Sequence, residues 1–391
     1  MHPNYSQQLR KVLEQAVASG AAPGLMAIVA DREHVLFEGW AGLRELPEQT
    51  PMTPDSIFWI ASLTKLVTAV AALQLVERGL LALDDPIDPL LPDLADYQVL
   101  TGFAEDGTPQ LRAPLRRITL RHLLSHSSGL SSDLMDPILA RARGAGGAEL
   151  PFVRRSLRGP LRFDPGDGWT YGTGSDWAGL AIEAVTGQRL GDYFAAAIFA
   201  PLGMSDTDFA VPIERRAPLY ARTGPNEFVP SASPVDDRSV WQYDPGGGGL
   251  FGSAGDYIRL LQTLLCDGMA AGGQILAPAS VDLLFRAQTG SVRAGALDAG
   301  VPGMPAPFDL FPAMASGWSV GGMINPDDAE GRRRAGSLGW AGWANTYYWV
   351  DRSAGICAVL MAQFLPFADR AMIAALGDFE RAAYAAEPLH M

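Results

Sequence analysis

Two residues three positions apart, Ser62 and Lys65, carry the clearest chemical signal in the sequence. They form an S-x-x-K pattern within the segment Ala-Ser-Leu-Thr-Lys, residues 61–65. The segment opens a helix that the apolar pattern predicts over residues 62–78, and such a helix places Lys65 one turn beyond Ser62. The pair has the residue types of a nucleophile and of the base that accepts its proton.

The choice of lysine at position 65 also argues against a purely structural role. The chain contains 28 arginines and only two lysines. A cation in the first turn opposes the positive end of the helix dipole, so the dipole and an apolar surround both favour the neutral amine. Arginine could not replace it, because a guanidinium stays protonated. In the structural alternative Ser62 caps the helix, but a capping box would place Glu or Gln where Lys65 stands.

A second serine pattern, Gly-Trp-Ser-Val-Gly at residues 317–321, matches the nucleophile elbow G-x-S-x-G around Ser319. An elbow needs a strand, a turn and a helix, followed later in the chain by a histidine. Instead, a loop rich in Gly, Pro and Arg follows Ser319, and the only later histidine is His390, next to the last residue. We therefore do not expect Ser319 to be the nucleophile.

Two further patterns resemble ligand sites but are better explained by structure. His122 and His126 are four residues apart, yet no acidic third ligand lies at a clear spacing, so we expect packing or capping rather than metal binding. The run of four glycines at residues 246–249 is not followed by the Gly-Lys-Ser/Thr of a phosphate loop. A tight turn leading into a helix near Asp256 is expected there.

The predicted elements indicate one sheet assembled from the two ends of the chain. Two hairpins are predicted, one near each end: residues 24–30 with 34–40, and residues 346–350 with 356–364. Helices are predicted at both termini, over residues 1–19 and 368–385. Pro-rich loops and short helical pieces dominate between them. We predict a discontinuous α/β domain, residues 1–84 and 250–391, with a mostly helical inserted domain, residues 85–249.

Composition excludes several classes of function. The net charge is −13 and the longest basic run is three arginines, so a nucleic-acid partner is not expected. The first residues lack the apolar run of an export signal, and no stretch reaches about 18 uninterrupted apolar residues, which predicts a cytoplasmic protein without a membrane partner. Cys266 and Cys357 lack zinc-ligand spacing and are expected as buried free thiols in a reducing compartment.

Four segments together resemble the serine β-lactamase-related superfamily, and within it most closely the family VIII carboxylesterases, which are similar in fold to class C β-lactamases. The segments are I-A-S-L-T-K (60–65), T-L-R-H-L-L-S-H-S-S-G-L (119–130), D-P-G leading to Tyr171 (164–171) and G-G-G-G-L-F-G-S-A-G-D-Y (246–257). The resemblance spans roughly residues 20 to 365. It implies an α/β (α+β) fold, an antiparallel sheet flanked by helices with an inserted mostly helical domain.

The resemblance also implies three catalytic residues. Ser62 matches the nucleophile, and Lys65 and Tyr171 match the coupled pair that moves its proton. Tyr171 stands where β-lactamases have the Tyr of Tyr-x-Asn, but Thr173 replaces the Asn, which weakens the case for a β-lactam amide side chain. Asp176 is left open between orienting the site and capping a helix.

A third family motif, Lys-Thr-Gly in β-lactamases and Trp-Gly-Gly in many of these esterases, corresponds to Trp340-Ala341-Gly342. We expect it at the head of the strand that contains residues 343–349. The implied oxyanion hole consists of the backbone N–H groups of Ser62 and Trp343. Trp340 and Gly342 are assigned to substrate binding, and Trp340 in place of lysine removes a cation and supplies an apolar wall suited to neutral esters.

These roles imply a serine carboxylesterase that hydrolyses small neutral, short-acyl esters through an acyl-enzyme on Ser62. No metal or organic cofactor is expected, and the predicted partner is a small-molecule ester. Three alternatives stay open: an acyltransferase that passes the same acyl group to an alcohol, a β-lactamase or D-aminopeptidase-type hydrolase, and a non-catalytic binding protein on this scaffold. The natural ester, its acyl length, the enantioselectivity and the oligomeric state are not predicted.

Overall fold

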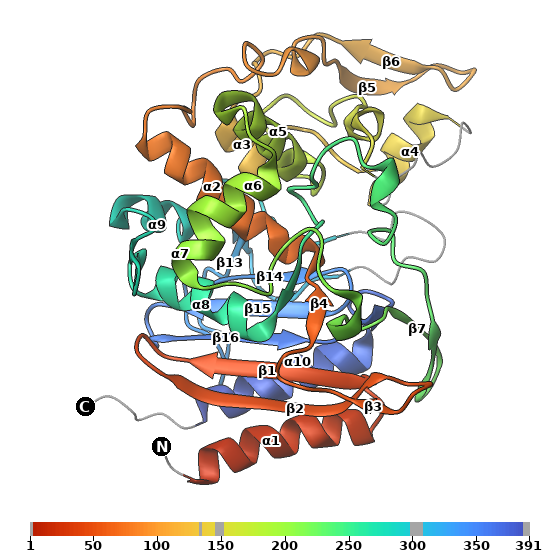
Figure 1. The fold of residues 1–391 in the computed structure, drawn as a ribbon. Helices are drawn as coiled ribbons and strands as arrows, with labels where there is room; N and C mark the ends of the chain where they lie inside the picture. The colour runs from red at the N-terminus through yellow and green to blue at the C-terminus, as the bar shows by residue number, and fades with distance from the viewer. Residues whose placement is uncertain (1–2, 133–134, 145–151, 298–307, 386–391) are drawn as a thin grey trace.

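The computed structural model describes residues 3–132, 135–144, 152–297 and 308–385, arranged around a large antiparallel sheet (Figure 1). Its eight strands follow the order β12-β13-β14-β15-β16-β1-β2-β3. Their bounds are β1 Gly24–Ala30, β2 Val35–Glu45, β3 Thr50–Pro51, β12 Gly317–Trp318, β13 Met323–Ile324, β14 Leu338–Gly342, β15 Thr346–Asp351 and β16 Ile356–Met361. This sheet with its flanking helices confirms the predicted fold class.

The two ends of the chain meet in the middle of this sheet. Strand β1 pairs with β16, with Met26 opposite Met361 and Ala30 opposite Cys357. The hairpins β1–β2 and β15–β16 confirm the two predicted hairpins. Every residue of β1 is buried, because both faces of this central strand are covered, and its sequence is accordingly a continuous apolar run.

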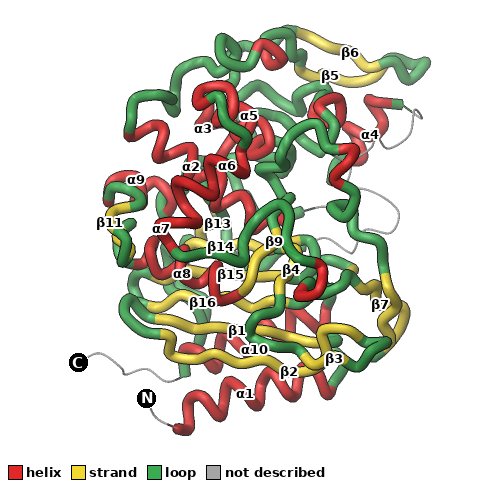
Figure 2. Tube along the Cα trace, in the orientation of Figure 1, coloured by secondary structure: helices red, strands yellow, loops and turns green. Residues whose placement is uncertain are grey.

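Helices cover both faces of the sheet. Helix α1 (Pro3–Ala18) packs on β2 and against α10 (Arg370–Tyr384), whereas α8 (Ala254–Leu265) contacts β1, β15 and β16 (Figures 1 and 2). The apolar residues predicted on one face of α1, Leu9, Leu13 and Ala16, are buried. The terminal helices therefore fasten the two halves of the sheet together.

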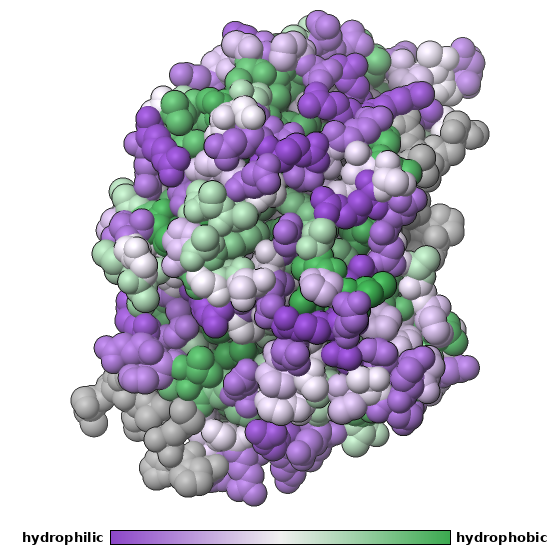
Figure 3. Space-filling view, in the orientation of Figure 1, coloured by the Kyte–Doolittle hydropathy of each residue, from purple (hydrophilic) through white to green (hydrophobic). Residues whose placement is uncertain are grey.

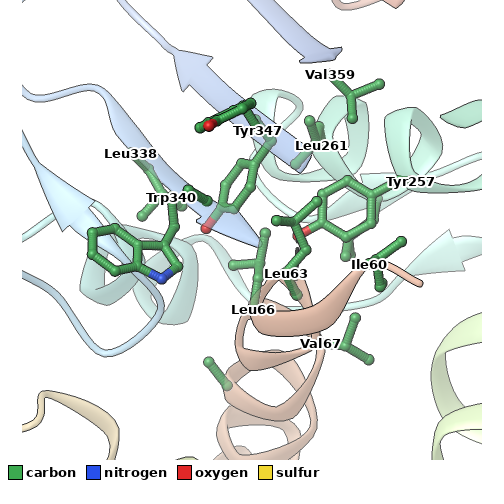
Figure 4. Close-up of a cluster of buried hydrophobic side chains, with 14 of the residues drawn as sticks. Ile60, Leu63, Leu66, Val67, Tyr257, Leu261, Leu338, Trp340, Tyr347 and Val359 are labelled. Atoms are coloured by element: carbon green, nitrogen blue, oxygen red, sulfur yellow. Dashed lines mark hydrogen bonds between the residues drawn. The ribbon is translucent and has the colours of Figure 1, made fainter. Parts of the chain in front are cut away.

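Helix α2 (Thr64–Glu77) follows a short 3-10 turn, Ala61–Leu63, and is apolar on nearly all sides. Leu63, Leu66 and Val67 lie in one cluster with Tyr257 and Leu261 of α8, beside side chains of the sheet (Figure 4). The helix ends before a glycine with positive φ, at residue 79, as the sequence predicts. Burial between two layers explains why α2 lacks a polar face, and it holds the N-terminus of the helix rigidly.

The remaining elements lie above the large sheet or beside it in Figure 1. They are β4 Ile57–Trp59, β5 Val99–Phe103, β6 Pro109–Arg112, α3 Leu120–Leu124, α4 Pro137–Arg143, α5 Gly174–Thr186, α6 Leu190–Phe194, α7 Ala200–Leu202, β7 Tyr220–Gly224, β8 Glu227–Pro230, β9 Phe251–Ser253, β10 Met269–Ala270, β11 Gly273–Gln274, α9 Pro278–Leu284 and β17 Phe364–Leu365. The β5–β6 and β7–β8 hairpins were not anticipated, and β7 pairs with β17. The boundaries of the inserted domain stay a prediction.

The surface in Figure 3 mixes hydrophobic and hydrophilic patches, and the two cysteines differ in their burial. On the face shown in Figure 3, hydrophobic side chains lie in separate patches between hydrophilic ones. Within the described ranges, no helix is long and apolar enough to cross a membrane. Both cysteines are free, and the prediction of buried thiols is confirmed for Cys357. It is wrong for Cys266, which follows the last residue of α8 and is only half-buried.

Candidate active site

The nucleophile candidate Ser62 lies in the 3-10 turn that precedes α2, next to a strained residue. Ala61 has a φ of 46°, a left-handed conformation that a residue with a Cβ rarely adopts. The Thr64 hydroxyl donates to the Ala61 carbonyl at 2.6 Å and accepts from the Leu250 N–H at 3.2 Å. The Ile60 N–H donates to the Leu250 carbonyl at 3.0 Å. The surrounding bonds thus hold the turn, and with it Ser62, in one conformation.

Lys65 lies beside Ser62 and beneath Tyr171. Its Nζ donates to Ser62 Oγ at 3.2 Å and to the Gly247 carbonyl at 2.5 Å. The same nitrogen lies 4.6 Å from the centre of the Tyr171 ring. Only 7% of Lys65 is exposed. The structure therefore brings together the three residues to which the resemblance gives catalytic roles, although they come from two separate parts of the chain.

The glycine run at residues 246–249 lies against the first turns of α2. Its turn closes with a bond from the Gly249 N–H to the Pro245 carbonyl at 3.0 Å, and strand β9 separates it from α8. Three successive carbonyls each accept one side chain from the nucleophile region: Gly246 from Thr68 at 2.7 Å, Gly247 from Lys65 at 2.5 Å and Gly248 from Trp59 Nε1 at 2.7 Å. The predicted turn is confirmed, but its role in anchoring the lysine was missed.

Asp176 holds this glycine loop from the other side. Its Oδ1 accepts the Gly247 N–H at 3.0 Å, and the carbonyl of the same residue binds Lys65, so Gly247 alone links the carboxylate to the lysine. Burial raises the pKa of Asp176, while the charge of Lys65 and the Gly247 N–H act in the opposite direction. Asp176 lies in the first turn of α5, whose N-cap is Thr173. Of the two roles left open by the sequence, the contacts favour orienting the site.

Tyr171 is buried and its phenolic oxygen has a defined donor. Trp340 Nε1 donates to Tyr171 Oη at 3.0 Å, and Trp340 itself is only 2% exposed. This hydrogen bond fixes the position of the phenolic oxygen. The sequence assigned Trp340 to substrate binding, which stays a prediction, and missed its contact with the tyrosine.

The third motif does not lie where the sequence placed it. Trp340-Ala341-Gly342 ends strand β14, and Trp343 lies in the turn before β15, so its expected position at the head of a strand containing residues 343–349 is wrong. The Asn345 N–H closes this turn on the Gly342 carbonyl at 3.0 Å, with Asn345 at a φ of 63°. The sequence does not reveal this turn, because the aromatic residues typical of strands continue on both sides of it, through residue 349.

A close approach at Gly342 places this turn beside the nucleophile. A Cβ on Gly342 would lie 2.5 Å from the Ile60 carbonyl oxygen and 2.1 Å from Thr346 Oγ1, so only glycine fits. Thr346 Oγ1 also donates to the Ile60 carbonyl at 3.2 Å. These contacts tie the turn containing Trp343 to the segment before Ser62. The oxyanion hole formed by the N–H groups of Ser62 and Trp343 stays a prediction.

The serine and histidines set aside in the sequence have other roles. Ser319 lies between strands β12 and β13, is fully buried, and its Oγ accepts the Gly321 and Gly322 N–H groups at 3.0 and 3.1 Å. No helix follows it as in an elbow. His122 forms a reciprocal capping box with Thr119, which confirms its predicted capping role. His126 is buried and packs against Tyr171, with ring centres 4.6 Å apart, which confirms the expected packing role, although the sequence did not indicate the partner.

The glycine loop offers a test of how Lys65 is held. A Cβ on Gly247 would lie 2.5 Å from Asp176 Oδ2, whereas one on Gly248 would meet its nearest described neighbour at 3.8 Å. We expect Gly247→Ala to displace the carbonyl that binds Lys65 and to lower kcat, for the ester hydrolysis predicted from the sequence, about 10- to 100-fold. Gly248→Ala is the matched control and should keep kcat within about threefold. Equal kcat values for both variants would contradict the anchoring role.

Comparisons with known proteins cover nearly the whole chain. A family model described as Beta-lactamase matches residues 9–382. Lovastatin esterase from Penicillium rubens is 34% identical over 88% of this chain and 90% of its own length. Monacolin J acid methylbutanoyltransferase from Aspergillus terreus is 33% identical over 96% and 95%. The solved structure of unliganded simvastatin synthase from Aspergillus terreus has a TM-score of 0.81 at 31% identity, covering 98% of this chain and 99% of that one.

Proposed function

This chain belongs to the beta-lactamase family, and from that premise we propose that it is a serine carboxylesterase for small neutral esters. Esterase and acyltransferase relatives of similar length support the coarser description, an acyl-transferring serine enzyme. The observation that carries the proposal is the 3.2 Å contact between Lys65 Nζ and Ser62 Oγ, under a Tyr171 whose oxygen receives the Trp340 N–H. A small-molecule ester is the proposed partner, without nucleic acid, membrane or cofactor.

In the first step of the proposed reaction, Ser62 Oγ attacks the carbonyl carbon of the ester. The hydroxyl proton passes to the coupled pair of Lys65 and Tyr171. The N–H groups of Ser62 and Trp343 stabilise the negative charge that develops on the carbonyl oxygen. The C–O bond to the alcohol then breaks. The alcohol leaves with the proton returned by the pair, and the acyl group stays on Ser62 as an ester.

In the second step, water replaces the alcohol. The pair removes a proton from the attacking water, the tetrahedral intermediate collapses, and Ser62 regains its proton as the carboxylic acid leaves. Lys65 and Tyr171 act as a unit, because the charge on one changes the proton affinity of the other. The Trp340 N–H holds the phenolic oxygen of Tyr171 in place during both steps.

The preference for neutral esters rests on the third motif. Trp340 stands where β-lactamases carry a lysine, so the site lacks that cation for an anionic substrate. The names of the similar proteins also point to small acyl groups, since one is a methylbutanoyltransferase. We propose short, neutral acyl groups, from acetyl to methylbutanoyl, as the substrate range.

A second candidate, acyl transfer to an alcohol, is favoured by the names of two of the three similar proteins, a methylbutanoyltransferase and a synthase. The same acyl-enzyme would form, and an alcohol would replace water in the second step. The two reactions use the same residues around Ser62 and differ in how the acyl group divides between water and the alcohol. Partitioning of the acyl group therefore has to be measured.

The test compares three reactions at one pH and temperature: p-nitrophenyl butyrate alone, p-nitrophenyl butyrate with a millimolar secondary alcohol, and a chromogenic cephalosporin. We expect ester turnover to exceed cephalosporin turnover and butyric acid to be the main product. Faster cephalosporin hydrolysis would support a β-lactamase, and a dominant butyryl ester of the added alcohol would support the transferase. Failure of a fluorophosphonate probe to label the folded protein would support a non-catalytic binding protein.

A further inference from the structure

His126 contacts three consecutive residues of the chain, with Tyr171 in the middle. Its carbonyl oxygen accepts the Thr170 N–H at 3.0 Å, and its ring Nδ1 accepts the Gly172 N–H at 3.4 Å. The imidazole ring lies against the Tyr171 ring, with centres 4.6 Å apart. His126 therefore accepts hydrogen bonds from the backbone on both sides of the tyrosine and packs on its side chain.

The backbone of His126 is itself held in an unfavourable conformation. Its φ is 56°, in the left-handed region, where residues other than glycine are uncommon. It follows the last turn of α3, and the Ser127 N–H bonds to the His122 carbonyl at 3.0 Å. This turn directs both the carbonyl and the ring of His126 toward residues 170–172. Such strain persists only where surrounding contacts over-determine it.

The bond from Gly172 also defines the state of the ring. Because Nδ1 accepts a hydrogen bond, the proton of the neutral imidazole must lie on Nε2. Burial, and secondarily the charge of Lys65, lowers the pKa of His126 well below its usual value, which keeps the ring neutral. Nε2 is buried without a hydrogen-bond partner among the described residues, and the Trp318 and Trp169 rings lie edge-on, at 5.1 and 6.3 Å.

From these contacts we propose that His126 is a positioning residue that holds Tyr171 at Lys65 through the hydrogen bonds to Thr170 and Gly172. Trp340 restrains the phenolic oxygen at one end of the tyrosine, and His126 restrains the backbone at the other. Lys65 lies over the ring between these two restraints. Among the described residues, the side-chain hydrogen bond of Ser62 is with Lys65 and that of His126 is with Gly172, so His126 acts through Tyr171. The inference rests on the proposed acyl-transfer function.

A packing role is the rival explanation, and two substitutions separate it from positioning. His126→Asn keeps an acceptor near the place of Nδ1 and tolerates a left-handed backbone, but it loses the ring. His126→Phe keeps the ring and loses the acceptor. Positioning predicts that Asn restores activity better than Phe, whereas packing predicts the reverse order.

The experiment measures kcat and KM for p-nitrophenyl butyrate, together with the rate of Ser62 labelling by a fluorophosphonate. For His126→Phe we expect kcat and the labelling rate to fall at least about 30-fold, with KM within about threefold; for His126→Asn we expect kcat within about fivefold of the wild type. Equal losses in both variants, or a better Phe variant, would overturn the proposal. Each variant is compared at a temperature where circular dichroism shows it folded.

A measurement on the unsubstituted protein keeps the proposal testable if a variant does not fold. Only five histidines are present, so the ring nitrogens of His126 can be followed by ¹⁵N NMR. We expect a neutral ring protonated at Nε2 alone. A proton on Nδ1 would overturn the proposal. If the wild type hydrolysed no ester, the proposed function would fail, while the labelling rates and the ring tautomer would still decide the role of His126.

Discussion

Replacing Ser62 by alanine is expected to abolish hydrolysis of p-nitrophenyl acetate, with a fall in kcat of at least about 10⁴-fold. The reason is that no acyl-enzyme can form without the hydroxyl that lies 3.2 Å from Lys65 Nζ. Ser62 occupies a turn held by backbone and threonine bonds, so loss of one oxygen should leave the fold intact. Initial rates under substrate saturation, with thermal unfolding measured in parallel, check this.

Ser319→Ala is the control for this prediction. The Ser319 hydroxyl is buried and bonded to the backbone of its own turn. Its loss should lower stability by about 1 kcal/mol and leave most of the activity. Activity that survives Ser62→Ala but disappears in Ser319→Ala would show that Ser319 is the nucleophile.

Replacing Lys65 by arginine should lower kcat at least about 10³-fold, even though arginine is the other basic side chain of similar length. A guanidinium does not give up its proton at neutral pH, so it cannot accept the proton of Ser62. It also cannot reproduce the single-point contact of Nζ with the Gly247 carbonyl and the Tyr171 ring. The measurement is kcat for p-nitrophenyl butyrate across the neutral pH range.

The chain supplies a matched control, because its only other lysine, Lys11, is exposed on α1. Lys11→Arg should leave kcat unchanged within about twofold. A Lys65→Arg enzyme that keeps more than about one tenth of the wild-type kcat would mean that Lys65 contributes charge rather than proton transfer.

The parts of the site that could be predicted from sequence are those fixed by local spacing or by motif. Ser62 and Lys65 are neighbours on one turn, so their approach follows from helix geometry. The buried α2 and the two hairpins follow from apolar patterns of the helix and strand periods. Tyr171 required the family motif, because nothing in the local sequence connects it to Lys65.

The parts that were missed depend on contacts between distant segments. Lys65 and Gly247 are 182 positions apart, and Tyr171 and Trp340 are 169 apart. A glycine run and a strand tryptophan have ordinary structural explanations until the fold brings them to a partner. The contacts of His126 with residues 170–172 were missed for the same reason. They depend on a left-handed backbone conformation at His126, which the sequence does not display.

The central claim, an acyl-enzyme on Ser62, is tested most directly by trapping the intermediate. The protein is mixed with p-nitrophenyl butyrate, quenched in acid within the first turnovers, digested, and its peptides are identified by tandem mass spectrometry. We expect one butyryl group, on Ser62, that is absent from the Ser62→Ala protein. A butyryl group located on Ser319 or on any other residue, or sustained turnover without a modified Ser62, would contradict it.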